Sequence, residues 1–156
     1  MNKEKVLDDK DIAILEALQA DGSMAFSELG RRIGLSQPAM SERVKRLEDR
    51  GIIAGYGVKI NERALGLRMM AIIRLKTAHE HIRACTKQFA EIPHIVEIYR
   101  VTGDDCFVLK ALVPAPEDVA AIVDSIGRFG AVTTSVVLQS EPPKPLTRKL
   151  LSAIEP

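Results

Sequence analysis

The stretch LSQPAMSERVKRLEDRGII, residues 35–53, concentrates the side chains best suited to recognising another molecule. Gln37 and Ser41 can hydrogen-bond to base edges, and Glu42 can accept a hydrogen bond from cytosine. Cationic residues further along can neutralise phosphates and release their counterions. The candidate DNA-contacting set is therefore Ser36, Gln37, Pro38, Ser41, Glu42, Arg43, Lys45 and Arg46.

The positive charge of this stretch is local. The whole chain of 156 residues has a formal net charge of +1, which argues against a uniformly basic packaging protein. Residues 1–30 carry a net charge of −4, and residues 31–60 carry +4. A basic helix face is more often only a solvated surface. Charge by itself therefore leaves DNA binding and simple solvation both open.

Helical periodicity predicts the element that would hold these side chains. Met40, Val44 and Leu47 recur at i, i+4 and i+7 and form one apolar stripe. Ser36 is the predicted N-cap, and Gly51 is the predicted stop. The residues that point most directly away from the stripe are Pro38, Glu42, Lys45 and Asp49.

Two further helices are predicted before it. The segment FSELGRRIGLS gives a short helix with Ser27 as its N-cap and Gly34 at its end. Two short helices joined by a tight IGLS turn form the helix-turn-helix pattern, whose second helix enters the major groove. The segment LDDKDIAILEALQADG predicts a first helix, in which Asp8 is the cap, Asp11 adds negative charge and Gly22 is the stop.

The rest of the chain alternates strands and helices. Strands are predicted in LRMMAIIRLKTA, HIVEIYRVTG, DDCFVLKALV and AVTTSVVLQSE, and helices in HEHIRACTKQFAEI and APEDVAAIVDSIGRFG. The order β-α-β-β-α-β predicts an α+β, ferredoxin-like layout, with two helices on one face of an antiparallel sheet. The other face would keep apolar residues, which favours self-association. The expected residues are Ile72, Val96, Ile98, Val136 and Leu138.

We predict four segments. Residues 1–53 form the helix-turn-helix domain, residues 54–67 a linker, residues 68–141 the ferredoxin-like domain, and residues 142–156 a C-terminal tail. The linker sequence IIAGYGVKIN favours a short extended segment or a hairpin. A two-fold dimer of such chains would present two recognition helices to half-sites about 34 Å apart, or a multiple of that.

These words in this order resemble the Lrp/AsnC, or feast-famine, family of transcription factors. The matching words are LDDKDIAILEALQADG, ELGRRIGLS, SERVKRLEDRGIIAGY, the pair Leu65–Gly66, VTGDDCFVLKA and TTSVVL, and they cover nearly the whole chain. The resemblance implies a DNA-binding regulator that recognises a palindromic operator in double-stranded DNA. It also implies homodimers that assemble further, as octamers for example, and an amino acid or related metabolite as effector.

One turn departs from the family pattern. Effector-responsive members often carry Gly-Asp-Tyr-Asp, where this chain has Gly103, Asp104, Asp105 and Cys106. A carboxylate facing an α-amino group makes a charge-assisted hydrogen bond that a thiol does not match. The resemblance places the effector at these four residues, with Thr134 and Ser135 nearby. The alternative is that Gly-Asp-Asp is only a tight turn.

The chain offers little for other chemistry. His79 and His81 lack a third metal ligand, and Cys85 and Cys106 lack CxxC spacing, so we expect no metal site and no cofactor. We also predict no catalytic residues. Two alternatives stay open: an enzyme resembling the sirohaem decarboxylases of the same two-domain build, and a metabolite-sensing or assembly module that does not bind DNA.

We expect a cytoplasmic, nucleoid-associated location. The opening residues MNKEKVLDDKD are charged and lack the apolar run of a signal peptide. No stretch approaches the roughly 18–20 apolar residues of a membrane span.

Overall fold

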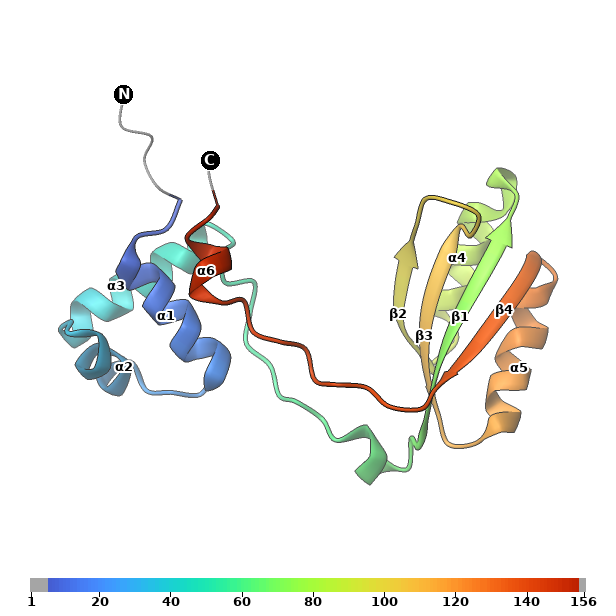
Figure 1. The fold of residues 1–156 in the computed structure, drawn as a ribbon, viewed down its shortest axis with the longest axis horizontal. Coiled ribbons are helices and arrows are strands. Elements are labelled where there is room, and N and C mark those ends of the chain that lie inside the picture. Colours follow the sequence, from blue (N-terminus) through green and yellow to red (C-terminus); the bar gives the residue numbers. More distant parts are fainter. Residues whose placement is uncertain (1–5, 155–156) are drawn as a thin grey trace. The chain divides into compact units, whose positions relative to one another are not determined.

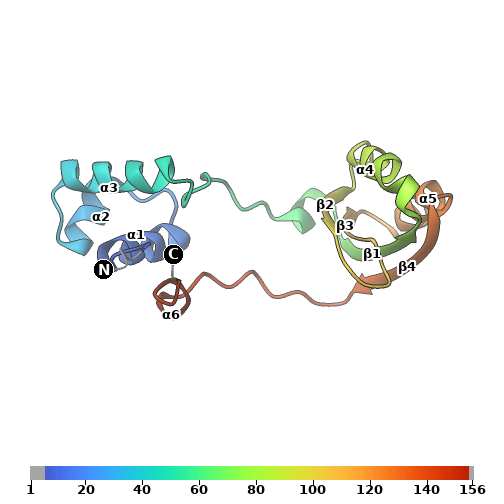
Figure 2. The same ribbon diagram turned by 90° about the horizontal axis from the view of Figure 1, so that it is seen from above.

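A computed structural model describes residues 6–154 and divides them into two compact units (Figures 1 and 2). The first unit holds the residues up to Lys59 together with those from Pro142 onward, and the second is Ile60–Glu141. The residues predicted as a separate C-terminal tail therefore belong to the same unit as the first three helices.

The first unit begins with helix α1, Asp9–Ala20. Asp8 is its N-cap, as predicted: its Oδ1 accepts a hydrogen bond from the amide of Asp11 at 2.8 Å, and the Asp11 carboxylate accepts one from the amide of Asp8 at 3.3 Å. The helix ends at Ala20, before the predicted stop at Gly22.

Helix α2, Phe26–Ile33, begins after an extended Ala25, which offers no capping side chain. The predicted cap, Ser27, lies inside the helix, so that prediction was wrong. Gly34 ends α2 with φ 74°, a left-handed conformation that favours glycine. A Cβ on Gly30 would lie 2.7 Å from the carbonyl oxygen of Leu35. The turn between α2 and α3 is therefore tight enough to require glycine at both positions.

Helix α3, Gln37–Asp49, is the predicted third helix. Ser36 is its N-cap, with Oγ accepting from the amide of Ala39 at 3.5 Å. Met40, Val44 and Leu47 are at most 1% exposed, which confirms the apolar stripe. The other buried apolar residues of this core are Leu7, Ile12, Ile14, Leu29 and Leu151.

Leu151 comes from α6, Arg148–Leu151, a short helix near the end of the chain. It is 5% exposed in the core of the helical unit, whereas neighbouring Leu150 is 53% exposed. Leu146, just before α6, and Arg148, its first residue, are also attached to α1. The amide of Leu146 donates to Gln19 at 2.7 Å, and the Arg148 guanidinium donates to Glu16 at 3.0 Å. Residues 146–151 thus complete the domain to which α1 belongs.

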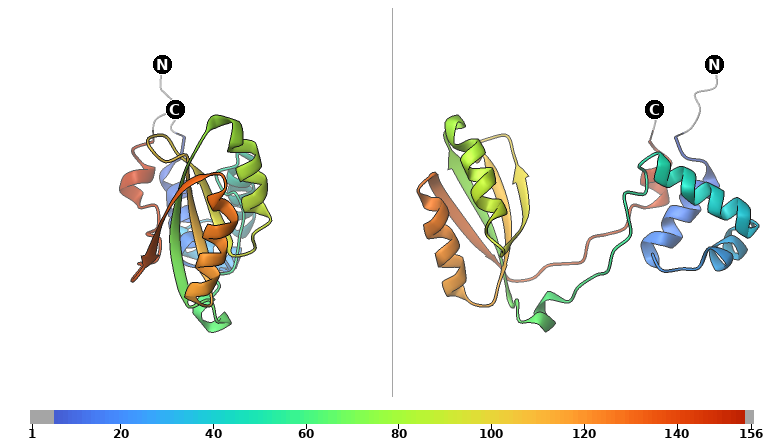
Figure 3. Two further views of the ribbon diagram at one scale, coloured as in Figure 1. Left: turned by 90° about the vertical axis from the view of Figure 1, so that its right-hand side faces the viewer. Right: turned by 180° about the vertical axis from the view of Figure 1, so that it is seen from behind.

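The second unit has the predicted β-α-β-β-α-β order. Its elements are β1 (Met69–Thr77), α4 (Ile82–Ala90), β2 (Ile95–Arg100), β3 (Phe107–Val113), α5 (Pro116–Gly127) and β4 (Gly130–Val137). The strands are antiparallel in the order β2-β3-β1-β4. Both helices lie on one face of the sheet (Figure 3). This arrangement confirms the predicted α+β ferredoxin-like class.

Strand register decides which residues occupy the open face of the sheet. Ile72 lies there, beside its partners Lys110 and Ser135. Ile98 is opposite Leu109 and Val136 is opposite Ala71, and both partners are fully buried on the helix side. The prediction that Ile98 and Val136 face away from the helices was therefore wrong. A bulge between Ile95 and Glu97 shifts the alternation along β2.

The open face is mixed rather than uniformly apolar. Met70 and Ile72 contribute apolar surface, with Leu112 and Val108 beside them on β3. The ammonium of Lys110 lies 2.8 Å from a carboxylate oxygen of Glu97 on the neighbouring strand. Ion-paired side chains and aliphatic side chains therefore alternate across the open face of the sheet.

The linker around Tyr56 is extended and has no strand ladder within residues 54–61. Tyr56, Val58 and Ile60 alternate along it and are all more than half exposed. The Tyr56 hydroxyl donates to the Glu48 carboxylate at 2.9 Å, which fastens the start of the linker to the end of α3. The predicted hairpin is not formed within this segment.

Candidate nucleic-acid interface

Helix α3 presents its polar side chains as its periodicity predicts. Pro38, Glu42, Lys45 and Asp49 are exposed, and so is Gln37 at the first turn. Ser41 is half-buried on the flank. Because the opposite side of α3 is held by the buried stripe, these groups stand on a rigid element with a fixed orientation.

Lys45 is the cation available to a ligand on this outward face. Its ammonium makes no hydrogen bond or ion pair with any of residues 6–154. Ser36 faces solvent at the start of the helix, where its hydroxyl caps the amide of Ala39. A polar N-terminus followed by an accessible lysine can read base edges first and hold a phosphate further along.

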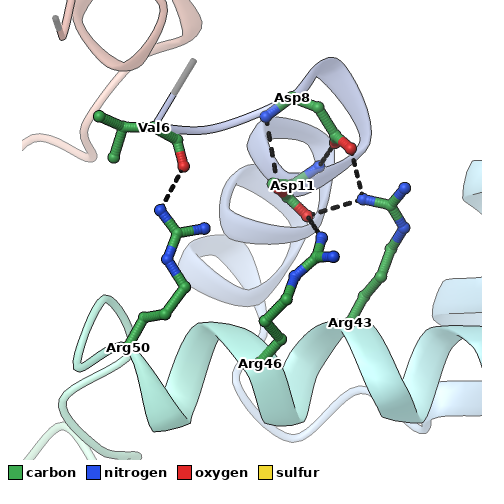
Figure 4. A network of polar contacts seen from close by, with 6 residues as sticks. All are labelled: Val6, Asp8, Asp11, Arg43, Arg46 and Arg50. Carbon is green, nitrogen blue, oxygen red and sulfur yellow. Dashed lines mark hydrogen bonds and ion pairs between the residues drawn. The ribbon is translucent and has the colours of Figure 1, made fainter. Parts of the chain in front are cut away.

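Arg43, predicted to contact DNA, turns toward α1 instead (Figure 4). Its Nη1 lies 2.6 Å from a carboxylate oxygen of Asp8 and 2.8 Å from one of Asp11. The Arg43 side chain is 25% exposed and that of Asp11 is 3% exposed. The structure therefore separates Arg43 from the outward-facing residues with which the sequence grouped it.

Arg46 and Arg50 point the same way (Figure 4). Nη2 of Arg46 lies 3.4 Å from the Asp11 carboxylate, and its side chain remains 52% exposed. Nη2 of Arg50 donates to the backbone carbonyl of Val6 at 2.5 Å. The three arginines follow at i, i+3 and i+7, so they form one row along α3, which we call the arginine row.

The same contacts shift two pKa values. Partial burial raises the pKa of Asp8, but hydrogen bonds from the Asp11 amide and the Arg43 guanidinium outweigh it and hold that pKa below its usual value. The hydrogen bond to Asp8 raises the pKa of Arg43. Each charged form thus stabilises the other, and the pair is ionised at neutral pH.

Sequence reasoning missed these partners for a physical reason. Arg43 and Arg46 are 35 residues from Asp8 and Asp11, respectively, in the chain. Helical spacing reports neighbours only within one helix. The i, i+3, i+7 repeat of arginines was a visible signal that these cations share a flank different from that of Lys45.

The predicted effector turn joins β2 to β3. Gly103 has φ 115°, and Asp104 is exposed beside it. Cys106 is half-buried: its amide donates to the carbonyl of Leu75 at 2.8 Å, and its thiol donates to the carbonyl of Thr77 at 3.2 Å. The thiol that stands in place of the family's second acid is therefore used to attach the turn to β1.

Thr134 and Ser135 lie on β4 and are exposed. Thr134 is opposite Ile73, on the helix side of the sheet, and Ser135 is opposite Ile72, on the open face. Strand β1 lies between β4 and the strand that follows the turn. One copy of the unit therefore does not bring these two residues and the turn together into a single pocket.

Two hollows are present elsewhere in the second unit. One of about 300 Å³ lies where β1 begins, against residues that include Arg63, Arg68, Met70, Leu112, Val137 and Ser140. Another of about 480 Å³ is lined by His79, Glu80, Ile82, Arg83 and Arg100. Arg100 directly precedes the β2–β3 loop, so the second hollow adjoins the segment that carries the predicted effector turn.

Metal and membrane chemistry find no site in the described part of the chain. Across residues 6–154, no three His, Cys, Asp or Glu side chains gather where they could hold a metal ion. The helices in that range are also too short or too polar to span a lipid bilayer.

A helix-turn-helix unit joined to a ferredoxin-like unit defines a class of DNA-binding regulators with a separate ligand-binding domain. Residues 7–48 match the AsnC-type helix-turn-helix domain, and residues 70–145 match the Lrp/AsnC ligand-binding domain. The chain is 33% identical to the transcriptional regulator LrpA of Pyrococcus horikoshii, over 82% of this chain and 92% of that one. The protein belongs to the Lrp/AsnC family of transcriptional regulators.

Solved structures of relatives have the same two-unit build. Bacillus subtilis LrpC is 30% identical and superposes with a TM-score of 0.83, covering 88% of this chain and 99% of that one. A transcriptional regulator from Neisseria meningitidis, solved as a complex with L-methionine, is 25% identical with a TM-score of 0.84. That comparison covers 93% of this chain and all of the other.

Proposed function

We propose that the protein regulates transcription by inserting α3 into the major groove of an operator. Gln37, Ser41 and Glu42 read base edges, and Lys45 binds phosphate. Ser36 and Pro38 set the start of the helix close to the DNA. The observation that carries the proposal is the placement of these groups on the exposed side of a helix whose other side is fully buried.

The proposed active form is a homodimer that binds a palindromic site and assembles further, up to an octamer. The alternating apolar residues of the linker, Tyr56, Val58 and Ile60, are exposed on a segment whose backbone joins no ladder. Such a segment can pair with the same segment of a second copy, and the mixed open face of the sheet can pack against its counterpart. Two copies of α3 would then meet two half-sites.

The proposed effector is an amino acid or a related metabolite, bound at the turn Gly103–Cys106. The proposal is supported by the match to a ligand-binding domain and by the exposed Asp104 carboxylate, which could receive an α-amino group. The hollow beside Arg100 offers guanidinium groups for a carboxylate. Thr134 and Ser135 would contribute across an interface between copies. We place the protein in the cytoplasm, associated with the nucleoid.

The test is a mobility shift on the DNA upstream of the protein's own gene, at two salt concentrations, with and without amino acids. A shift that survives excess nonspecific DNA supports the proposal, and its absence at both salts would contradict it. A haem-type absorption band in protein that shifts no DNA would favour the enzyme alternative. For the effector, calorimetric titration with each of the twenty amino acids should give heat for at least one. Absence of both heat and a thermal shift would remove the effector site.

A further inference from the structure

We propose that Arg43 is a positioning residue: through Asp8 and Asp11 it sets the orientation of α3 on its domain and does not bind DNA. This inference rests on the proposed function and assigns one of its candidate contacts a different role. It rests first on distance, because one guanidinium nitrogen lies within 2.8 Å of both carboxylates. The nitrogen that meets both carboxylates is not available to a phosphate without breaking those contacts, and the contacts hold the guanidinium facing α1.

The burial of Asp11 makes these contacts costly to break. Its side chain is 3% exposed, and all of its ionic partners among the described residues come from the arginine row on α3. Without Arg43, the buried Asp11 carboxylate would keep only the 3.4 Å contact with Arg46, and a buried charge with so weak a partner is unfavourable. DNA binding that recruited Arg43 would create this situation, whereas DNA binding that left it in place would not.

The two acids also form the capping box of α1. Asp8 accepts from the Asp11 amide, and Asp11 accepts from the Asp8 amide. The capping box in the first turn of α1 thus fixes both carboxylates independently of their contacts with Arg43. The contact is therefore a rigid connection between the start of α1 and the middle of α3. It holds α3 on a different side from the one held by the apolar stripe.

Arg46 and Lys45 complete the division of roles. Arg46 is half exposed and reaches Asp11 only at 3.4 Å, so it can share its charge with a phosphate. Lys45 has no partner in the described chain and faces outward. Within the arginine row, Arg43 is therefore held by Asp8 and Asp11, whereas Arg46 is shared between Asp11 and a phosphate. The main phosphate contact is made by Lys45, on the other flank of α3.

The experiment uses the full-length protein and a duplex that the wild type selects from random-sequence DNA. Fluorescence anisotropy gives affinity at four salt concentrations, and poly(dI-dC) gives the nonspecific reference. The variants are Arg43→Met, Arg43→Lys and Asp11→Asn, with Lys45→Ala as the comparator. All binding is measured at least about 15 °C below each variant's melting temperature, so that every sample is folded.

We expect Arg43→Met to lower selectivity for the chosen duplex by about tenfold, since contacting residues and their supports couple at this scale. Its salt slope should stay at the wild-type value. Arg43→Lys should recover part of the selectivity, and Asp11→Asn should reproduce Arg43→Met. A protein that carries both Arg43→Met and Asp11→Asn should be no less selective than either single variant. Lys45→Ala should instead flatten the salt slope by about 0.9.

Two results would overturn the inference. A flattened slope in Arg43→Met, together with tighter binding by Asp11→Asn, would make Arg43 a phosphate contact restrained by Asp11. Unchanged selectivity with a lowered melting temperature would make the pair a contributor to stability alone. If Arg43→Met does not fold, Arg43→Lys and Asp11→Asn carry the same comparison. A wild type without any selectivity would refute the proposed function itself, which is a distinct outcome.

Discussion

The guanidinium of Arg148 donates a hydrogen bond to the carboxylate of Glu16 at 3.0 Å, although 132 residues separate them in the chain. Next to this contact, Leu151 is buried in the helical core. The C-terminal segment therefore stabilises the DNA-binding unit, and its removal should lower the stability of that unit.

Leu151→Ala should lower the free energy of unfolding of the helical unit by about 2 kcal/mol, because it empties part of a packed core. Leu150→Ala is the matched control: that side chain is 53% exposed, and its loss should stay within about 0.5 kcal/mol. Chemical denaturation of the two variants measures both. Equal effects at the two positions would show that α6 does not pack on α1 in solution.

Lys45→Ala should weaken DNA binding similarly on all sequences and reduce the slope of log affinity against log salt by about 0.9, because one phosphate contact is lost. Lys87→Ala removes the same charge from an exposed position on α4 and should leave the slope unchanged. Anisotropy titrations at several salt concentrations report both slopes. A Lys45 variant that binds like the wild type at every salt would exclude α3 as the docking face.

Asp8 should contribute a pH-dependent stabilisation. Its pKa in the folded protein is lowered from 3.8, so the contribution is present above that pH and is lost as the pH falls through the folded value. Asp8→Asn keeps the oxygen that caps α1 but replaces the charged oxygen that accepts from Arg43, whereas Asp8→Ala also loses the cap, at about 1 kcal/mol. The melting temperature of Asp8→Asn should lie below that of the wild type at pH 7 and pH 5. The difference should close toward pH 3, and a constant difference would contradict the ion pair with Arg43.

Gly130→Ala should disrupt the pairing of β1 with β4. A Cβ at this position would lie 2.0 Å from the carbonyl oxygen of Lys76, so the backbone must move, and we expect a loss of about 3 kcal/mol. Gly127→Ala, three residues earlier in an open environment, should change stability by less than about 1 kcal/mol. Thermal unfolding compares them. Similar melting temperatures for the two variants would show that the strand adapts to a methyl group.

Local periodicity predicted the parts of the fold that depend on neighbours in sequence. Met40, Val44 and Leu47 are buried because a helix repeats every 3.6 residues, and this alone fixed the exposed side of α3. The capping of α1 by Asp8 and of α3 by Ser36 follows from the same short range. The six-element order of the second unit was also visible, since each element carries its own apolar pattern.

The wrong predictions concern features of the structure that residues distant in the sequence determine. Arg43 was grouped with the outward set because its partners lie in another helix. Ile98 was assigned to the open face because a bulge in β2 is invisible to simple alternation. Leu151 lies in a short, Pro-rich, charged stretch, in which no periodic apolar pattern predicts burial. Ser27 was preferred as a cap on chemistry, but the backbone turns at Ala25.

Because segments on both sides of Ile60–Glu141 belong to the helical unit, the sheet unit is topologically an insertion within the DNA-binding domain. Two covalent connections, rather than one, join the two units. The inserted unit therefore cannot rotate freely without winding the two connecting segments around each other. A single protease cut in either connection would leave two fragments held together by the packing of α6 on α1. Such nicked protein should elute as one particle in native buffer and separate into two only in denaturant.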